Sequence, residues 1–217
     1  MTSAPKTRPR GRPRSEAAES HQAVMDAVYA FLKEHSVREL TMEGIAERAN
    51  VGKPTIYKWW PNKSLVALDA YLAGMTEQVP TPDSGSAEVD FARQLKSLMA
   101  FYTSPLGRLF GQFIAEGQSD PSFLALFRER FLYARRAAAR VMWQRGVDRG
   151  EIRNEIDGEI VLDMIYGPMI FRLLAGHGSL GPRESDALVE AVFAGVRRSK
   201  DRHVAKLKRN GSVVNGP

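Results

Sequence analysis

The stretch TMEGIAERANVGKPTIYKWWPNK, residues 41–63, decides the fold, because it predicts two short helices joined by a tight turn. Thr41 is a good N-cap for the first helix, and Asn62 and Asp157 are N-cap candidates for two later helices. Pro54 suits the first turn of the second helix, where the N–H that proline lacks would have no partner anyway. Between them, NVG at 50–52 is a turn signal. A capped helix, a turn with glycine and a second short helix have the layout of a helix-turn-helix.

The second helix of this stretch carries the side chains that a DNA-reading helix needs. Ile56 and Trp60 are four residues apart, so they share one face and can pack on the first helix. The other positions offer cations and hydroxyls for phosphates, and aromatic edges for sugars or thymine methyl groups. These available residues are Lys53, Thr55, Tyr57, Lys58 and Trp59. A helical hairpin unrelated to DNA is the alternative interpretation.

Residues 15 to about 72 resemble the DNA-binding domain of the tetracycline-repressor (TetR) family of bacterial transcriptional regulators. The strongest parts are T-x-x-x-I-A-x-x-A-x-V at 41–51 and G-x-x-T-I-Y-x-x-W-P-N-K-x-L at 52–65. The family usually has phenylalanine where Trp60 stands, and often histidine or tyrosine where Trp59 stands. The Trp60 replacement keeps the role of a core aromatic residue, whereas Trp59 departs from the family pattern.

The resemblance implies a role for each matching position. Residues that would hold DNA phosphates are Thr41, Tyr57 and Lys63. Residues that would face the major groove are Lys53, Pro54, Thr55 and Lys58, with Trp59 at its edge. Residues that would form the core are Ile45, Ala46, Ile56 and Trp60.

The whole chain reads as all-α, with about nine helices, because apolar residues recur at helical spacing and no period-2 strand is convincing. We expect a three-helix DNA-binding domain at 15–79 and a linker, PTPDSGS, at 80–86. A ligand-binding and dimerisation bundle is expected at 87–198. Residues 1–14 and 199–217 are expected to form a disordered basic arm and a disordered basic tail.

Charge is unevenly distributed along the chain. Residues 1–63 carry 11 Lys and Arg against 7 Asp and Glu, a net charge of +4. Residues 64–196 carry 13 against 17, a net charge of −4, and residues 197–217 carry 7 against 1, a net charge of +6. Basic ends around an acidic middle indicate nucleic-acid contact through the ends, although solubilising tails would show the same pattern.

The basic arm contains RPRGRPR at 8–14. Its centre, PRGRP at 9–13, resembles the core of an AT-hook, an arm that lies in the minor groove of A·T-rich DNA. The resemblance implies minor-groove contacts by Arg10, Arg12 and Arg14. A solvated basic leader is the alternative.

The resemblance also implies two tasks for the C-terminal half, because TetR-family members dimerise through their last two helices and bind a ligand among the middle ones. The expected homodimer pair is IVLDMIYGPMIFRLLAGHG at 160–178 and PRESDALVEAVFAGVRR at 182–198. Small residues interleaved with large apolar ones suit a four-helix contact between subunits, although an intramolecular core explains them equally.

A cavity for a largely apolar small-molecule effector is expected among the middle helices, although plain core would use the same residue types. Gln112 lies among apolar residues there and would either orient a ligand or be exposed, and the same holds for Glu116. The residues expected to line the cavity are Met99, Tyr102, Phe110, Phe113, Glu116, Trp143, Tyr166 and Met169.

Several function classes find no support in the sequence. The chain has no cysteine and its four histidines are scattered, so we expect no disulfide, no metal site and no cofactor. No nucleophile elbow, Walker loop or H-E-x-x-H motif occurs, which argues against an enzyme. No apolar run approaches the ~18 residues of a membrane span, and no apolar segment follows the basic N-terminus as in a signal peptide. We therefore expect a cytoplasmic protein.

These features together predict a DNA-binding transcriptional regulator. The expected mechanism is a homodimeric repressor with two recognition helices about 34–36 Å apart on a palindromic operator. A small molecule would release it by favouring a dimer with wrongly spaced helices. An architectural or ligand-independent DNA-binding protein is the alternative, and activation instead of repression would depend on where the operator lies.

Overall fold

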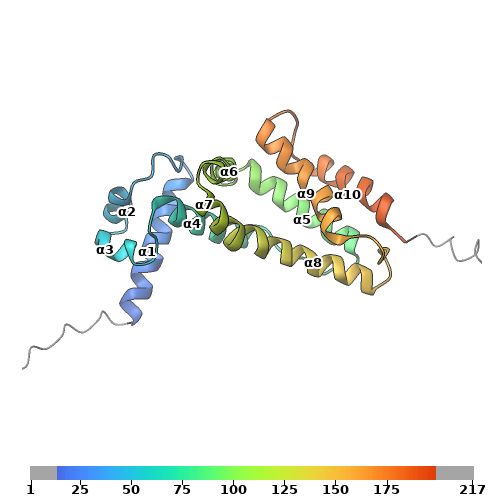
Figure 1. The fold of residues 1–217 in the computed structure, drawn as a ribbon, viewed down its shortest axis with the longest axis horizontal. Coiled ribbons are helices and arrows are strands. Elements are labelled where there is room, and N and C mark those ends of the chain that lie inside the picture. The colour runs from blue at the N-terminus through green and yellow to red at the C-terminus, as the bar shows by residue number, and fades with distance from the viewer. Residues whose placement is uncertain (1–13, 199–217) are drawn as a thin grey trace, which may run out of the picture. The chain divides into compact units, whose positions relative to one another are not determined.

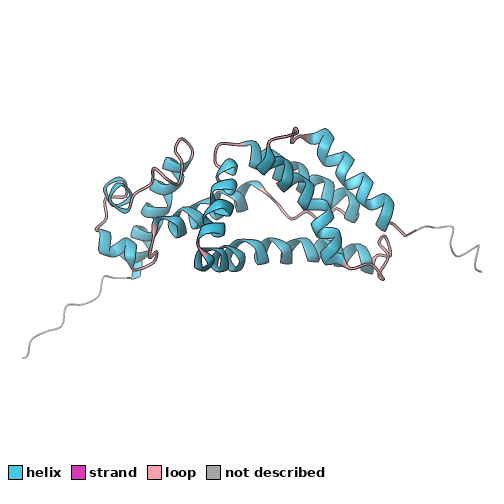
Figure 2. Ribbon diagram, turned by 45° about the horizontal axis from the view of Figure 1, so that its top comes forward, coloured by secondary structure: helices cyan, strands magenta, loops and turns pink. Residues whose placement is uncertain are grey.

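The structure, a computed structural model, describes residues 14–198 and is helical throughout this range (Figures 1 and 2). The only extended pairing within 14–198 is an isolated bridge between Ile152 and Arg197. No helix of the described range is long and apolar enough to cross a membrane. The elements in chain order are α1 (Arg14–Leu32), α2 (Met42–Arg48), α3 (Lys53–Tyr57), α4 (Lys63–Gln78), α5 (Ala87–Thr103), η1 (Gly107–Leu109), α6 (Phe110–Ser119), α7 (Pro121–Phe127), η2 (Arg128–Leu132), α8 (Tyr133–Asp148), α9 (Gly158–Ala175) and α10 (Pro182–Val196).

The prediction of an all-α fold is confirmed. The π-helical turn η2 joins α7 directly to α8, so these three elements form one continuous run. Counted as one helix, this run gives the nine helices that the sequence predicts for the part of the chain described here.

The helices pack as two compact units. The first unit contains the described residues up to Gln78 together with Tyr102–Arg128, and the second contains Val79–Phe101 and the chain from Glu129 onward. Helices α6 and α7 therefore belong to the same unit as the helix-turn-helix, although α4 and α5 separate them from it in the chain. These packing units differ from the predicted DNA-binding domain at 15–79 and the predicted ligand-binding and dimerisation domain at 87–198, and that assignment of functions stays a prediction.

The core of the first unit depends on a close approach at Gly74 of α4. A Cβ atom at Gly74 would lie 2.4 Å from Tyr29 Cε2 and 2.7 Å from Leu106 Cδ2, so no larger residue fits there without a shift. On the same helix, buried Tyr71 meets the ring of Phe113 of α6 edge-on, at 5.3 Å between ring centroids. Large side chains of this kind each stabilise the fold by about 1.5–3 kcal/mol when fully buried.

Helices α2 and α3 form as the sequence predicts. The Thr41 hydroxyl oxygen accepts the Gly44 N–H at 3.0 Å and thereby caps α2. Asn50 turns the chain with a φ of 51°, a left-handed conformation that asparagine tolerates better than most residues. Ile45 and Ile56 are fully buried, which holds the two short helices on a common core.

The second unit is built from most of α5 and from α8, α9 and α10. Phe91 of α5 lies 5.9 Å from Phe193 of α10 between ring centroids. Gly146 of α8 allows close packing, because a Cβ atom there would lie 2.6 Å from both Ala87 Cβ and Ile152 Cδ1. These contacts join the start of α5 to the end of α8 and to α10.

A charged cluster fastens α8 to the start of α9. Arg136 donates to Glu159 at 2.6 Å and to Asp163 at 2.5 Å, and Arg140 also donates to Glu159. The hydrogen bonds from Arg140 and Arg136 lower the pKa of Glu159 from 4.5 to about 2. Asp157 caps α9, as the sequence predicts, by accepting the Glu159 N–H at 2.9 Å.

Candidate nucleic-acid interface

The predicted DNA-contacting residues of the helix-turn-helix lie on the outside of the first unit, while the predicted core residues lie inside. Ile45, Ile56 and Trp60 are buried, whereas Ala46, also predicted to be core, is only half-buried, and Tyr57 is 50% exposed. The other predicted contacts comprise exposed Thr41, Lys53, Pro54 and Lys58, and half-buried Thr55, Trp59 and Lys63. Helix α3 thus has one face for its own fold and another free for a partner.

Lys53, the first residue of α3, is paired with a carboxylate of α2. Its Nζ lies 2.9 Å from Glu43 Oε1, and both side chains are at least half exposed. The hydrogen bond from Lys53 lowers the pKa of Glu43, and the same contact raises the pKa of Lys53. The charge of this predicted DNA contact is therefore compensated within the protein.

The other two predicted DNA-contacting lysines have uncharged partners. Lys63 Nζ donates to the backbone carbonyl oxygen of Arg38 at 2.8 Å. Lys58 Nζ lies 5.7 Å from the centroid of the Trp59 ring. A lysine ammonium has three donors, so neither contact occupies it fully.

A ring cluster holds the end of α3 against α1 and α4. The His21 ring of α1 lies 4.7 Å from the Trp60 ring and 5.2 Å from the Trp59 ring, measured between centroids. Trp60 Nε1 donates to Asp69 Oδ2 at 2.7 Å. The phenylalanine that the TetR family usually has at this position could not donate this hydrogen bond.

Sequence reasoning missed His21 and Asp69, although one signal pointed to the latter. A buried indole N–H needs an acceptor, and Asp69 lies nine residues after Trp60 on the next helix. Sequence reasoning did identify the cap of that helix, since Asn62 Oδ1 accepts the Leu65 N–H at 3.0 Å.

The predicted minor-groove arm lies outside the described residues. Arg10 and Arg12 precede the described range, and Arg14 is the first residue of α1, with its side chain outside the description. Contact of the arm with the minor groove therefore stays a prediction.

The residues predicted to line an effector cavity divide between the two units. Those in the first unit are Tyr102, Phe110, Phe113 and Glu116. Those in the second unit are Met99, Trp143, Tyr166 and Met169. Six of the eight are buried, Tyr166 is half-buried and Glu116 is exposed. Because the eight residues belong to two units, a single cavity lined by all of them stays a prediction.

Two polar groups near these residues have partners inside the protein. Gln112 Oε1 of α6 accepts the backbone N–H of buried Val37 at 2.9 Å, which ties α6 to the connection between α1 and α2. The Tyr166 hydroxyl donates to Oε1 of Gln94, a buried residue of α5. Gln112 is thus a half-buried structural link, a role that differs from both roles considered for it from the sequence.

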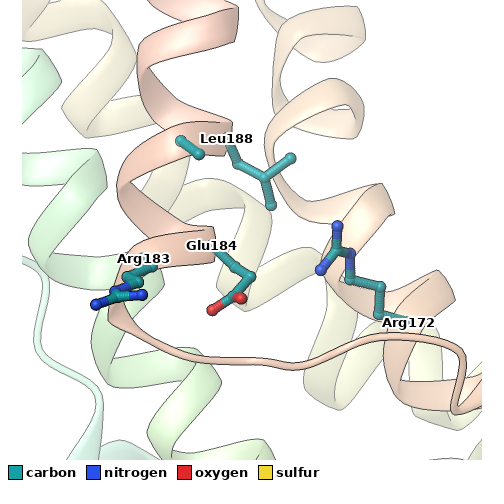
Figure 3. Close-up of a pocket in the computed structure, with 5 residues that line it drawn as sticks. Arg172, Arg183, Glu184 and Leu188 are labelled. Atoms are coloured by element: carbon teal, nitrogen blue, oxygen red, sulfur yellow. The ribbon is translucent and has the colours of Figure 1, made fainter.

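A pocket opens at the start of α10, and none of the eight residues predicted to bind a ligand lines it (Figure 3). Two of its charged groups have partners in the loop before α10. Ser179 donates to Glu184 at 2.5 Å, and its carbonyl oxygen accepts from Arg172 at 3.1 Å. The lining residues are Arg172, Arg183, Glu184, Ala187 and Leu188. In residues 14–198 no group of three or more His, Asp or Glu side chains could hold a metal ion.

Family models match both halves of the chain. The model for bacterial regulatory proteins of the tetR family matches residues 24–68, and the model for the tetracyclin repressor-like C-terminal domain matches residues 81–192. The uncharacterized HTH-type transcriptional regulator YdeS of Bacillus subtilis is 38% identical over 188 residues, which cover 87% of this chain and 94% of YdeS. The HTH-type transcriptional regulator AqdR of Rhodococcus erythropolis is 27% identical over 156 residues, which cover 72% of this chain and 75% of AqdR.

Solved structures show the same architecture. The TetR family transcription regulator SCO0332 has a TM-score of 0.75 and 30% identity, over 82% of this chain and 98% of that protein. The transcriptional regulator FadR from Bacillus subtilis, solved in complex with stearoyl-CoA, has a TM-score of 0.61 over 81% of this chain and 98% of FadR. At 17% identity the FadR match shows a common fold alone.

Proposed function

The chain belongs to the TetR family and is a DNA-binding transcriptional regulator, and we propose that it works as a homodimeric repressor which a small molecule releases from a palindromic operator. We further propose that it acts in the cytoplasm and that it catalyses no reaction. DNA contact is assigned to the exposed face of α3 and to its flanking residues Thr41 and Lys63.

The observation that carries the proposed dimer is an exposed apolar stripe along α9. Ile160, Met164, Phe171 and Leu174 are between 48% and 65% exposed. Their spacings of four, seven and three residues place them on one face of the helix. Gly167 lies on the same face, and a Cβ atom there would meet nothing within 4 Å. Monomeric proteins rarely leave such a contiguous apolar surface uncovered.

Helix α10 offers a surface of small residues beside this stripe. Ala187, Ala191, Ala194 and Gly195 are all exposed, and a Cβ atom at Gly195 would also meet nothing within 4 Å. Small residues let helices approach closely, and the large side chains of α9 can fill the space that they leave. Two copies of this pair would form a two-fold symmetric four-helix contact.

The proposed effector is largely apolar. The residues assigned to its cavity are mostly aromatic or methionine side chains, which suit an apolar ligand. FadR, which shares the fold, was solved with stearoyl-CoA, a ligand with a long acyl chain, and this fold can thus accommodate a large apolar group. An effector can shift the DNA-binding equilibrium only through its different affinities for the bound and released forms.

Selection of bound sequences from random duplex DNA by the purified full chain tests the proposal. We expect enrichment of a two-fold symmetric site whose half-sites lie about one helical turn apart or a multiple of it. Binding without any preferred sequence would contradict the operator and would favour the architectural alternative. An enriched site without symmetry would contradict the homodimer.

A further inference from the structure

We propose that Glu43 weakens the sequence-independent binding of this protein to DNA by holding Lys53 in an ion pair that competes with DNA phosphate. The inference rests on the proposed assignment of Lys53 to the DNA interface. It goes beyond that assignment because it gives a role to an acidic residue that does not itself bind DNA.

The geometry brings the two charges together from different helices. Glu43 lies in the first turn of α2, and Lys53 is the first residue of α3. Their side chains meet at 2.9 Å, with Lys53 50% exposed and Glu43 67% exposed. Helices α2 and α3 pack on one another, and each buries an isoleucine, Ile45 or Ile56, so the two short helices hold the pair in place.

Lys53 has a charged partner, whereas the partners of Lys58 and Lys63 are uncharged. Lys63 donates to a backbone carbonyl and Lys58 lies near an indole ring, so both keep their full positive charge toward a partner. Lys53 alone among these three is compensated by a carboxylate. The number of counterions that DNA releases on binding depends on how many phosphates the protein neutralises. A lysine already compensated by a carboxylate therefore contributes less to DNA affinity.

The Glu43–Lys53 ion pair and a contact of Lys53 with DNA phosphate have similar free energies, so Glu43 can compete with phosphate for Lys53. An exposed ion pair is worth only a small free energy, so DNA can break it where a base edge gives Lys53 a good contact. At an arbitrary sequence the lysine would gain only one phosphate contact, and the released carboxylate would face the negative backbone. A repulsive element of this kind reduces binding to wrong partners, which matters because non-operator DNA is in large excess.

Binding to short random-sequence duplex DNA tests the inference without a known operator. For Glu43→Gln we expect affinity to rise about fivefold at about 0.15 M salt, the gain from one more neutralised phosphate. The slope of log affinity against log salt concentration should steepen by about 0.9. Fluorescence anisotropy of labelled duplex, titrated between about 0.05 and 0.2 M salt, measures both quantities.

Two further variants separate the ion pair from net charge. Glu47 lies one turn further along α2, is exposed, and forms no ion pair with any described residue, so Glu47→Gln removes the same charge without releasing a lysine. We expect it to change affinity by much less than Glu43→Gln. In the background Lys53→Gln, the substitution Glu43→Gln should have little effect, because no lysine remains to be released.

Several results would overturn the inference. An unchanged salt slope for Glu43→Gln would show that Lys53 gains no phosphate contact. An equal gain from Glu47→Gln, or a gain that persists with Lys53→Gln, would show a general effect of charge. Failure of the unsubstituted protein to bind any duplex would instead contradict the DNA-binding assignment itself, so the two failures are distinguishable.

Discussion

The α2–α3 surface and the α9–α10 surface are both exposed, yet they have opposite chemistry. Around α3 the exposed side chains end in ammonium and hydroxyl groups, as in Lys53, Lys58 and Tyr57. Along α9 they are apolar, as in Met164 and Phe171. A polar group needs a partner at a defined distance and angle, whereas an apolar stripe needs only to be covered. The first surface can therefore be interpreted residue by residue, and the second only as a whole.

The largest expected effect is on the apolar surface. Phe171→Glu places a charge from each subunit in the proposed interface, and we expect it to weaken dimerisation by at least about 2 kcal/mol. Sedimentation should then show a monomer where the unsubstituted protein is a dimer. Val141 is 48% exposed and lies on α8, outside the α9 stripe. Val141→Glu should therefore sediment as a dimer, like the unsubstituted protein. A Phe171→Glu protein that remains dimeric would remove α9 from the interface.

The next largest effect is expected on stability, from the loss of one buried hydrogen bond inside the first unit. Gln112→Leu leaves the buried Val37 N–H without an acceptor, and we expect the free energy of unfolding to fall by about 1–3 kcal/mol. Chemical denaturation measures this loss. Gln112→Glu keeps an acceptor oxygen at the same place and should retain more of the stability. Equal losses in both variants would show that packing, not the hydrogen bond, matters at this position.

A smaller effect is expected on the polar surface. Lys58→Gln should reduce affinity for random duplex DNA about fivefold at about 0.15 M salt and make the salt slope shallower by about 0.9. Its stability should not change, because Lys58 is exposed. Lys33 provides a matched control, since its Nζ also lies over an aromatic ring, 4.4 Å from the centroid of Tyr29, but is not assigned to DNA. Similar losses for Lys33→Gln would mean that the interface is not confined to α2, α3 and the start of α4.

The smallest effect concerns the charged cluster of the second unit. Because the pKa of Glu159 is lowered to about 2, its charged form stabilises the folded state fully above about pH 4.5. That contribution is lost as the pH falls from about 4.5 to about 2. The stability difference between the unsubstituted protein and Glu159→Gln should therefore shrink over this window, as thermal unfolding at each pH would show. A constant difference would mean that Arg136 and Arg140 do not hold the carboxylate in its charged form.

Local signals in the sequence were reliable wherever the physical cause lies within a few residues. Thr41, Asn62 and Asp157 each cap a helix as predicted, since a cap needs only its own side chain and the next turn. The division of α3 into buried Ile56 and exposed Tyr57 also follows from helical spacing alone.

Partners that depend on the angle between helices were missed. The Lys53–Glu43 pair spans ten residues and requires α2 and α3 to cross so that their starting turns meet. Gln112 and Val37 are 75 residues apart, and apolar periodicity marks a residue as buried without naming the helix that covers it. The residues predicted to line the effector cavity divide between two units for the same reason. Their apolar character marked them as inward-facing but did not say which other helices they pack against.

The sequence by itself determined the all-α class, the helix-turn-helix and the family, because residue types at fixed short spacings specify caps, turns and a recognition helix. Only the tertiary structure decided which polar groups are paired, such as Lys53 with Glu43, and which apolar groups remain uncovered, such as Phe171. The physical reason is range: capping and helical spacing act within a turn or two, whereas pairing and coverage depend on where distant helices pack.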